Sequence, residues 1–238
     1  MTDAQGRAAQ AARPLGTGPT TRSSGEELVL SGIALVAAGL SPNLFWLAQA
    51  GYFKLSTVAV WVLLPSAVAL GLLLALASAR QHDRLVNRML AGGIVGAVAT
   101  IGLEIVRSAG FHLGLMPGSL PRLMGVLLLD RFMLGPSLAS DLAGWAYHYW
   151  NGICFGLLFV VVLGRKPLWV ALGYGVMIAI GFLVSPAVSA LGIGFMGQNM
   201  PGMPVTVTMA HLAYGALLWL LARQWVRDPE WIFGRQPA

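Results

Sequence analysis

The sequence predicts an all-α integral membrane protein with about six transmembrane helices and one interfacial helix. Three observations support this fold class: 57% of the 238 residues are hydrophobic, only 10% are charged, and the mean hydropathy is +0.73. A soluble domain has about 25% charged residues, and its polar side chains cover the apolar interior. This chain has too few polar residues for that, so we expect most of its surface to face lipid.

About six segments are long and apolar enough to cross a bilayer, which requires roughly 20 predominantly apolar residues. They are residues 28–51, Leu55–Ala79, 89–110, 142–163, 168–191 and 205–222. The first is interrupted by the sequence SPN at residues 41–43, and the second contains Pro65. Proline is tolerated within a span where neighbouring helices satisfy the freed backbone groups. Residues 120–134 are too short and too charged to span, so we expect the interfacial helix there.

Basic residues predict the orientation, because cytoplasmic loops of membrane proteins are enriched in Lys and Arg. Those in alternate loops are Arg80, Arg84, Arg88, Arg165, Lys166, Arg223 and Arg227. Both termini are therefore predicted to be cytoplasmic, although the long third loop, with Arg122 and Arg131, weakly favours the reverse. Residues 1–25 are small and polar without the apolar segment of a signal peptide, which predicts a disordered cytoplasmic tail. We expect a transmembrane domain over 26–227 and a second cytoplasmic tail over 228–238.

Two pairs of motifs indicate an internal repeat. HYWNG (148–152) and HLAYG (211–215) share the pattern His-x-x-x-Gly, while GAVATIG (96–102) and GVMIAIG (175–181) share Gly-x5-Gly. Residues 89–163 and 168–222 are therefore interpreted as two copies of one helical hairpin, which together form a pseudo-repeated four-helix core. The glycines allow close approach of helix backbones, and packing is what holds membrane helices together.

These paired His-x-x-x-Gly helices, each preceded by a Gly-rich helix, resemble an uncharacterised family of small bacterial multi-pass membrane proteins. The resemblance covers about residues 89–222. It implies a bacterial inner (plasma) membrane location, and it implies no activity because none is assigned to the family.

Ionisable residues within the spans are the candidate site. In the predicted topology, Glu104, His148 and His211 lie at similar depth, each about two helical turns from the outer surface. Charged groups in hydrocarbon cost roughly 2.5–3.5 kcal/mol each, so they tend to face the bundle interior and pair. We predict an outer pocket formed by these three residues. The residues expected to support it are Arg107, His112, Asn151 and Tyr214.

Three interpretations of this cluster stay open. In the first it is a structural network, in which Glu104 pairs with Arg107 and the histidines bond to neighbouring helices. In the second, two imidazoles and a carboxylate bind a metal ion. In the third, His148 and His211 are the axial ligands of haem b. Copper is the first metal to test, because thioethers suit Cu(I). The methionines that precede His211 are Met196, Met200, Met203 and Met209, although methionine also serves as an apolar filler.

Two classes of function follow. The leading hypothesis is binding of a metal or haem for redox chemistry or metal handling; the alternative is a non-catalytic membrane subunit or a small-solute or proton carrier. The chain has no Gly-rich phosphate loop, H-E-x-x-H, C-x-x-C or G-x-S-x-G sequence, which are common catalytic motifs. Its arginines are scattered, so the lipid bilayer, and not nucleic acid, is the expected partner. Other membrane subunits are candidate partners.

Overall fold

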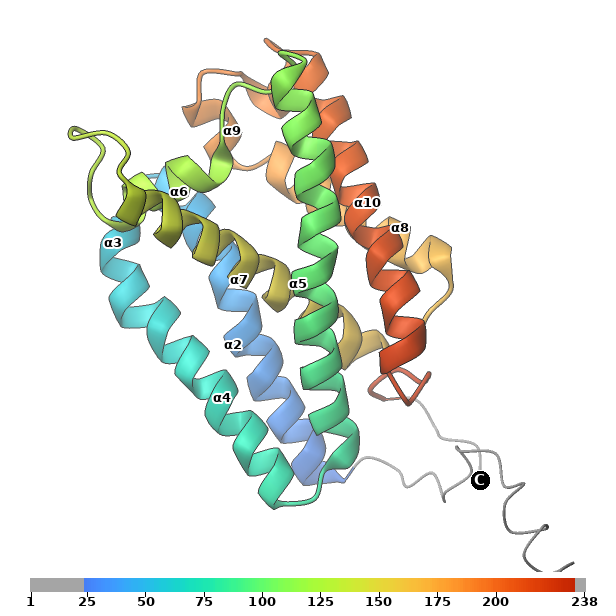
Figure 1. Cartoon of the computed structure of the whole chain (residues 1–238). Coiled ribbons are helices and arrows are strands. Elements are labelled where there is room, and N and C mark those ends of the chain that lie inside the picture. Colours follow the sequence, from blue (N-terminus) through green and yellow to red (C-terminus); the bar gives the residue numbers. More distant parts are fainter. Residues whose placement is uncertain (1–23, 234–238) are drawn as a thin grey trace, which may run out of the picture.

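The computed structural model describes residues 24–233, and all of their regular elements are helical (Figure 1). Within these residues, five helices are long and apolar enough to cross a membrane, which fits the predicted membrane protein. They are α2 (Gly25–Gln49), the continuous helix Leu55–Ala79, α5 (Asp83–His112), α7 (Leu138–Leu163) and α10 (Gly202–Trp225). The second comprises α3 (Leu55–Val58), the π-helical turn η1 (Ala59–Leu63) and α4 (Leu64–Ala79). Most of the predicted N-terminal tail, 1–23, and residues 234–238 lie outside the described residues.

The fifth predicted span, 168–191, is shorter than expected. Its helix α8 (Leu168–Leu183) has 16 residues, a rise of about 24 Å against the roughly 30 Å of a hydrocarbon core. The chain then turns at Ser185, whose backbone is extended, into the short helix α9 (Pro186–Ala190). The α conformation is disfavoured for a residue that precedes proline, which explains why the chain is not helical at Ser185. Five long helices and one short apolar helix thus replace the six predicted spans.

The first predicted span is one continuous helix, because α2 continues through Pro42 of the SPN sequence. Side chains around the proline bond to this part of α2. Asn43 donates a hydrogen bond from Nδ2 to the Gly39 carbonyl at 2.6 Å. From α7, the Tyr147 hydroxyl donates to the Ser41 carbonyl at 2.7 Å. Side chains of α2 and α7 thus bond to the backbone on both sides of Pro42, and proline is tolerated within membrane helices.

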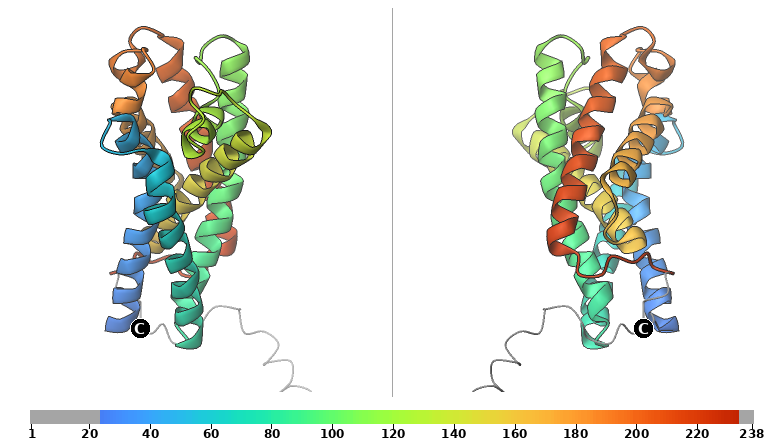
Figure 2. Two further views of the ribbon diagram at one scale, coloured as in Figure 1. Left: turned by 90° about the vertical axis from the view of Figure 1, so that its left-hand side faces the viewer. Right: turned by 90° about the vertical axis from the view of Figure 1, so that its right-hand side faces the viewer.

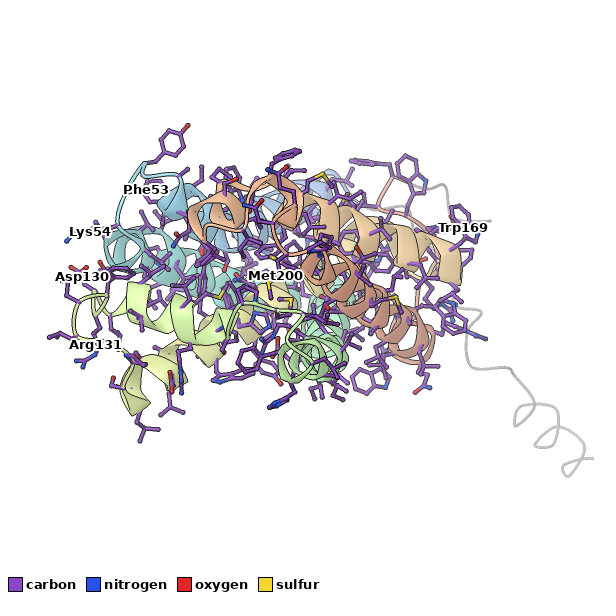
Figure 3. All side chains as sticks on the ribbon, turned by 90° about the horizontal axis from the view of Figure 1, so that it is seen from above. Phe53, Lys54, Asp130, Arg131, Trp169 and Met200 are labelled. Atoms are coloured by element: carbon purple, nitrogen blue, oxygen red, sulfur yellow. The ribbon has the colours of Figure 1, made fainter. Side chains whose placement is uncertain are left out.

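The helix that the sequence predicts to be interfacial is also shorter than expected. Helix α6 spans Leu120–Leu128, so residues 129–134 of the predicted helix lie in the connection to α7. Asp130 has a φ of 52°, the left-handed conformation in which α-helices end. Lys54 pairs with Asp130 at an Nζ–Oδ2 distance of 3.0 Å, at one edge of the bundle (Figure 3).

Helix α2 begins and α10 ends at the same end of the bundle, which we call the terminal end (Figures 1 and 2). An ion pair of 3.0 Å between Arg80 and Glu26 joins α4 to the start of α2 there. The short helices α6, α9 and η2 (Phe195–Gly197) lie toward the opposite end, which we call the cap end, and α5 and α10 extend beyond α6 and α9 there (Figure 1).

Glycines set the spacing of the central helices, as expected. A Cβ atom placed on Gly96 of α5 would lie 2.3 Å from the Gly152 carbonyl oxygen of α7. In the other hairpin, a Cβ on Gly175 of α8 would lie 2.2 Å from the His211 carbonyl oxygen of α10. Only glycine permits such close backbone contact. Both crossings therefore depend on residues of the two predicted Gly-x5-Gly motifs.

The described part of the predicted C-terminal tail packs against the terminal end. The amide of Ile232 donates to the Val162 carbonyl at 2.8 Å, and the side chains of Val226 and Ile232 are buried. Arg88 of α5 is 2% exposed. It donates to the Val161 carbonyl at 2.8 Å and also bonds to the Glu230 carbonyl. Residues 226–233 therefore pack against the terminal end of the bundle and do not form a free tail.

Candidate functional site: a cavity in the cap half

The polar centre of the candidate site joins α5 to α7. Arg107 donates from Nε and Nη2 to the two carboxylate oxygens of Glu104, each at 2.7 Å. Nε2 of His148 lies 2.9 Å from Glu104 Oε1. Arg107 is 7% exposed, Glu104 is 6% exposed and His148 is 9% exposed. Because Glu104 compensates the charge of Arg107, a buried group of this kind can exist at moderate energetic cost.

One donor of this group has no partner. Arg107 Nη1 is buried and has no hydrogen-bond partner among residues 24–233, and Arg107 lines a cavity of about 540 Å³. An unsatisfied buried donor costs roughly 1–3 kcal/mol, and more when the group is charged. The cavity wall therefore contains a guanidinium group whose hydrogen bonding is incomplete within residues 24–233.

His211 lines the same cavity as His148, but it does not join the Glu104 group. Its Nδ1 lies 2.8 Å from the Val207 carbonyl oxygen, within its own helix. Among residues 24–233 there is no group of three or more His, Cys, Asp or Glu side chains that is arranged to hold a metal ion. The predicted centre of one carboxylate and two imidazoles is therefore not formed among these residues. His211 bonds within its own helix, whereas Glu104 bonds to Arg107.

Three of the four predicted supporting residues line the cavity. They are Arg107, Asn151 and Tyr214. Asn151 Oδ1 accepts a hydrogen bond from the Ser41 hydroxyl at 2.6 Å, and the Tyr214 hydroxyl donates to the Gly152 carbonyl at 2.7 Å. They connect α2, α7 and α10 around the cavity. The prediction for His112 is wrong, because this last residue of α5 is exposed about 12 Å of helix rise beyond Glu104.

The predicted methionine ligands lie on different faces. Met209 of α10 is 53% exposed, whereas Met203 on the same helix is 1% exposed and lines the cavity. Met196 is exposed, and Met200 packs against the apolar cluster near η2. Figure 3 places Met200 over the middle of the cap end. The four do not share one site, so the soft-ligand set predicted for copper is not assembled.

The cavity wall comes from most of the bundle and is largely apolar. It includes parts of α2, α5, α6, α7, α8 and α10, and the connection between α5 and α6. Its volume is within the roughly 300–1,000 Å³ of small-molecule sites, which combine an apolar lining with a few placed polar groups. The methionines of the wall are Met116, Met124, Met177 and Met203. Sequence reasoning missed Met116, Met124 and Met177 as site residues, because no local pattern distinguishes a methionine in a wall from one in a core.

Part of the lining is exposed at the outer surface of the bundle. Asn43 on α2 and Met177 and Gly181 on α8 line the cavity and are also exposed. Met177 is 58% exposed. The cavity lining therefore reaches the surface of the bundle beside α2 and α8.

Comparison with family models, with curated proteins and with solved structures finds no match to this chain. The resemblance to bacterial membrane proteins with paired His-x-x-x-Gly helices therefore stays a prediction.

Proposed function

We propose that the protein is a non-catalytic membrane carrier or binding protein for a small, largely apolar molecule that bears hydrogen-bond-accepting oxygens. The observation that carries this proposal is the Arg107 side chain in the wall of a largely apolar cavity, with its Nη1 unpartnered among residues 24–233. A carbonyl or carboxylate oxygen there would complete the hydrogen bonding of the guanidinium group. The apolar body of the same molecule would fill the remainder of the cavity.

Two other polar residues line the cavity with Arg107, namely Asn151 and His211. Asn151 Oδ1 accepts a hydrogen bond from the Ser41 hydroxyl. Nδ1 of His211 lies 2.8 Å from the Val207 carbonyl oxygen, so Nδ1 carries the proton and Nε2 of the neutral ring is an acceptor. An oxygen acceptor of the ligand is therefore recognised by Arg107 and not by His211. Methionine side chains in the wall adapt to different shapes, and the exposed part of the lining beside α2 and α8 gives a molecule dissolved in the bilayer a path to the site.

The first experiment compares ligands with the same apolar chain and different head groups. The protein, in phosphatidylcholine nanodiscs, is heated with decanoic acid, methyl decanoate or decylamine. A ligand that binds only the folded state raises the midpoint of unfolding. The proposal requires a rise with decanoic acid or methyl decanoate and none with decylamine, which offers only donors. Equal midpoints with all three compounds would contradict it.

The variant Arg107→Lys sharpens this experiment. Lysine retains a positive charge near Glu104. Its one ammonium nitrogen cannot replace the two guanidinium nitrogens that bond to the carboxylate and also the third that is left for a ligand. We expect this variant to fold with a lower midpoint and to lose the ligand-dependent rise. A full ligand response in Arg107→Lys would show that Nη1 is not the recognising group.

Haem b is a second candidate, favoured by the hydrogen bond of His211. Histidines that ligate metals usually bond through the other ring nitrogen to a carbonyl or carboxylate, and Nδ1 of His211 does so with Val207. His148 lines the same cavity. A visible absorption spectrum and iron analysis after growth with a haem precursor test this candidate. A haem band that disappears in His211→Ala, with the protein still inserted, would support it; a spectrum without such a band would eliminate it.

We also propose that the protein lies in a bacterial inner membrane with its terminal end in the cytoplasm. The basic residues of alternate loops support this orientation, and it places the cavity in the outer half of the bilayer. In this arrangement α8 with α9 would count as the sixth crossing. Gly96 and Gly175 hold the same position in the two Gly-x5-Gly motifs, and each lies against a backbone carbonyl oxygen of the following long helix, which supports the proposed duplication of one hairpin.

A further inference from the structure

A second, polar pocket of about 470 Å³ lies at the terminal end, remote from the first. It is formed by the connection between α7 and α8 and by the last two turns of α10. Its lining residues are Arg165, Lys166, Pro167, Trp219 and Arg223. Three of the five are cationic, and no acidic residue lines the pocket.

The three cations of this pocket form no ion pair with a carboxylate of residues 24–233. Nε of Arg165 is buried there without a hydrogen-bond partner. Lys166 Nζ donates to the backbone carbonyl of Pro229 at 3.3 Å. The guanidinium of Arg223 lies 4.8 Å from the ring centre of Trp219, which holds it in place by a cation–π contact. By contrast, Arg80 at the same end pairs with Glu26.

The start of α8 adds to the positive potential of the pocket. Its N-cap residue is Pro167, and no side chain caps the helix, so backbone amides and the positive end of the helix dipole remain available to an anion. Trp169, in the first turn, is 73% exposed and projects at the edge of the bundle (Figure 3). Tryptophan in such a position is typical of the lipid head-group level.

We infer that this pocket binds a phosphate group, and that the source of the phosphate is the head group of an anionic phospholipid. Guanidinium groups form strong, directional hydrogen bonds with phosphate oxygens. Basic pockets between transmembrane helices on the cytoplasmic side bind anionic lipid head groups in this way. The site is independent of the cap-half cavity and of its proposed ligand.

The test measures lipid retained by the purified full-length protein. Nanodiscs contain phosphatidylcholine with one-tenth phosphatidylglycerol as the probe, and native mass spectrometry counts the phosphatidylglycerol that stays bound. The double variant Arg165→Gln/Arg223→Gln removes two charges from the pocket. The matched control Arg80→Gln/Arg227→Gln removes two charges from the same end outside the pocket. We expect retention to fall about tenfold or more in the first variant and to be unchanged in the control.

Equal retention in both double variants would overturn the inference. A separate arm adds inorganic phosphate to protein in phosphatidylcholine nanodiscs and follows the unfolding midpoint. A rise that requires Arg165 and Arg223, without selective phosphatidylglycerol retention, would retain a phosphate site and contradict the lipid source. A folding defect is identified by the unfolding midpoint of each variant without ligand. If the double variant is unfolded, the single variant Arg223→Gln, which removes an exposed side chain, is compared with Arg227→Gln instead.

Discussion

Glu104 and Arg107 lie one turn apart on α5 and are joined by two hydrogen bonds of 2.7 Å. This bidentate pair uses Nε and Nη2 of the guanidinium and leaves Nη1 without a partner among residues 24–233, in a residue that lines the cavity. The carboxylate thus has two effects: it compensates the buried charge, and it fixes the orientation of the donor that we assign to ligand binding. His148 of α7 contacts the same carboxylate at 2.9 Å and connects the pair to the neighbouring helix.

Removing Arg107 alone should destabilise the protein strongly. The substitution Arg107→Met leaves the Glu104 carboxylate buried without its two charged donors, a change that typically costs about 3–5 kcal/mol. We expect a clear fall in the unfolding midpoint in detergent micelles. The double variant Glu104→Gln/Arg107→Met removes the uncompensated charge and should recover much of the loss. A double variant less stable than Arg107→Met would contradict the ion-pair account.

The close crossing of α5 and α7 should be sensitive to one methyl group. In Gly96→Ala the new Cβ would lie 2.3 Å from the Gly152 carbonyl oxygen, so one helix must move; overpacking of this kind costs roughly 1–3 kcal/mol. The control Gly93→Ala, whose Cβ has its nearest neighbour at 3.7 Å, should be neutral or slightly stabilising. Unfolding midpoints of the two variants measure the difference, and equal midpoints would contradict the proposed packing.

The packing of the C-terminal segment 226–233 against the bundle should depend on Arg88. In Arg88→Met the carbonyls of Val161 and Glu230 lose a charged donor, and we expect a loss of about 2–4 kcal/mol in the free energy of unfolding. Arg80→Met removes an arginine whose side chain is 60% exposed and should change stability by less than about 1 kcal/mol. Proteolysis within 226–233 should accelerate only in the Arg88 variant; similar rates in both would refute this role.

The orientation can be tested with reporters. A reporter fused after Gln198, at the cap end, should be active in the outer compartment, whereas one fused after Arg80 should be active in the cytoplasm. This expectation follows from the basic residues of the alternate loops. Cytoplasmic activity of the Gln198 fusion would invert the proposed placement of the cavity in the bilayer.

Much of the fold could be predicted because its signals are local. Apolar segment length predicts the long helices, glycine spacing predicts the close crossings, and the i, i+3 spacing of Glu104 and Arg107 predicts their pair. The two Ser-Pro sequences show the limit of local reasoning. Ser41-Pro42 lies inside α2, where Tyr147 and Asn151 of α7 bond to Ser41. Ser185-Pro186 ends α8. The same dipeptide therefore lies inside one helix and at the start of another, and local sequence does not distinguish the two cases.

The cavity could be predicted only in part. Its polar residues are unusual within apolar spans, and this alone indicated Glu104, His148 and Asn151. The wall, however, combines residues from distant segments such as Pro42, Met116 and Met177, whose meeting depends on helix tilt and on the α5–α6 connection. The inward or outward direction of each methionine likewise depends on tertiary packing. Reasoning from metal-ligating residue types therefore predicted a metal centre that residues 24–233 do not form, and it did not predict the largely apolar cavity.

The most direct test of the central claim, that the cap-half cavity binds an apolar molecule with acceptor oxygens, is to fill the cavity. Gly181 lines the cavity, whereas Gly173, on the same helix α8, does not. A Cβ atom added at either glycine would have no neighbour within 4 Å. Decanoic acid binding is titrated with Gly181→Leu and Gly173→Leu in phosphatidylcholine nanodiscs. We expect at least about tenfold weaker binding for Gly181→Leu and unchanged binding for Gly173→Leu. Equal affinities in the two variants would contradict the claim.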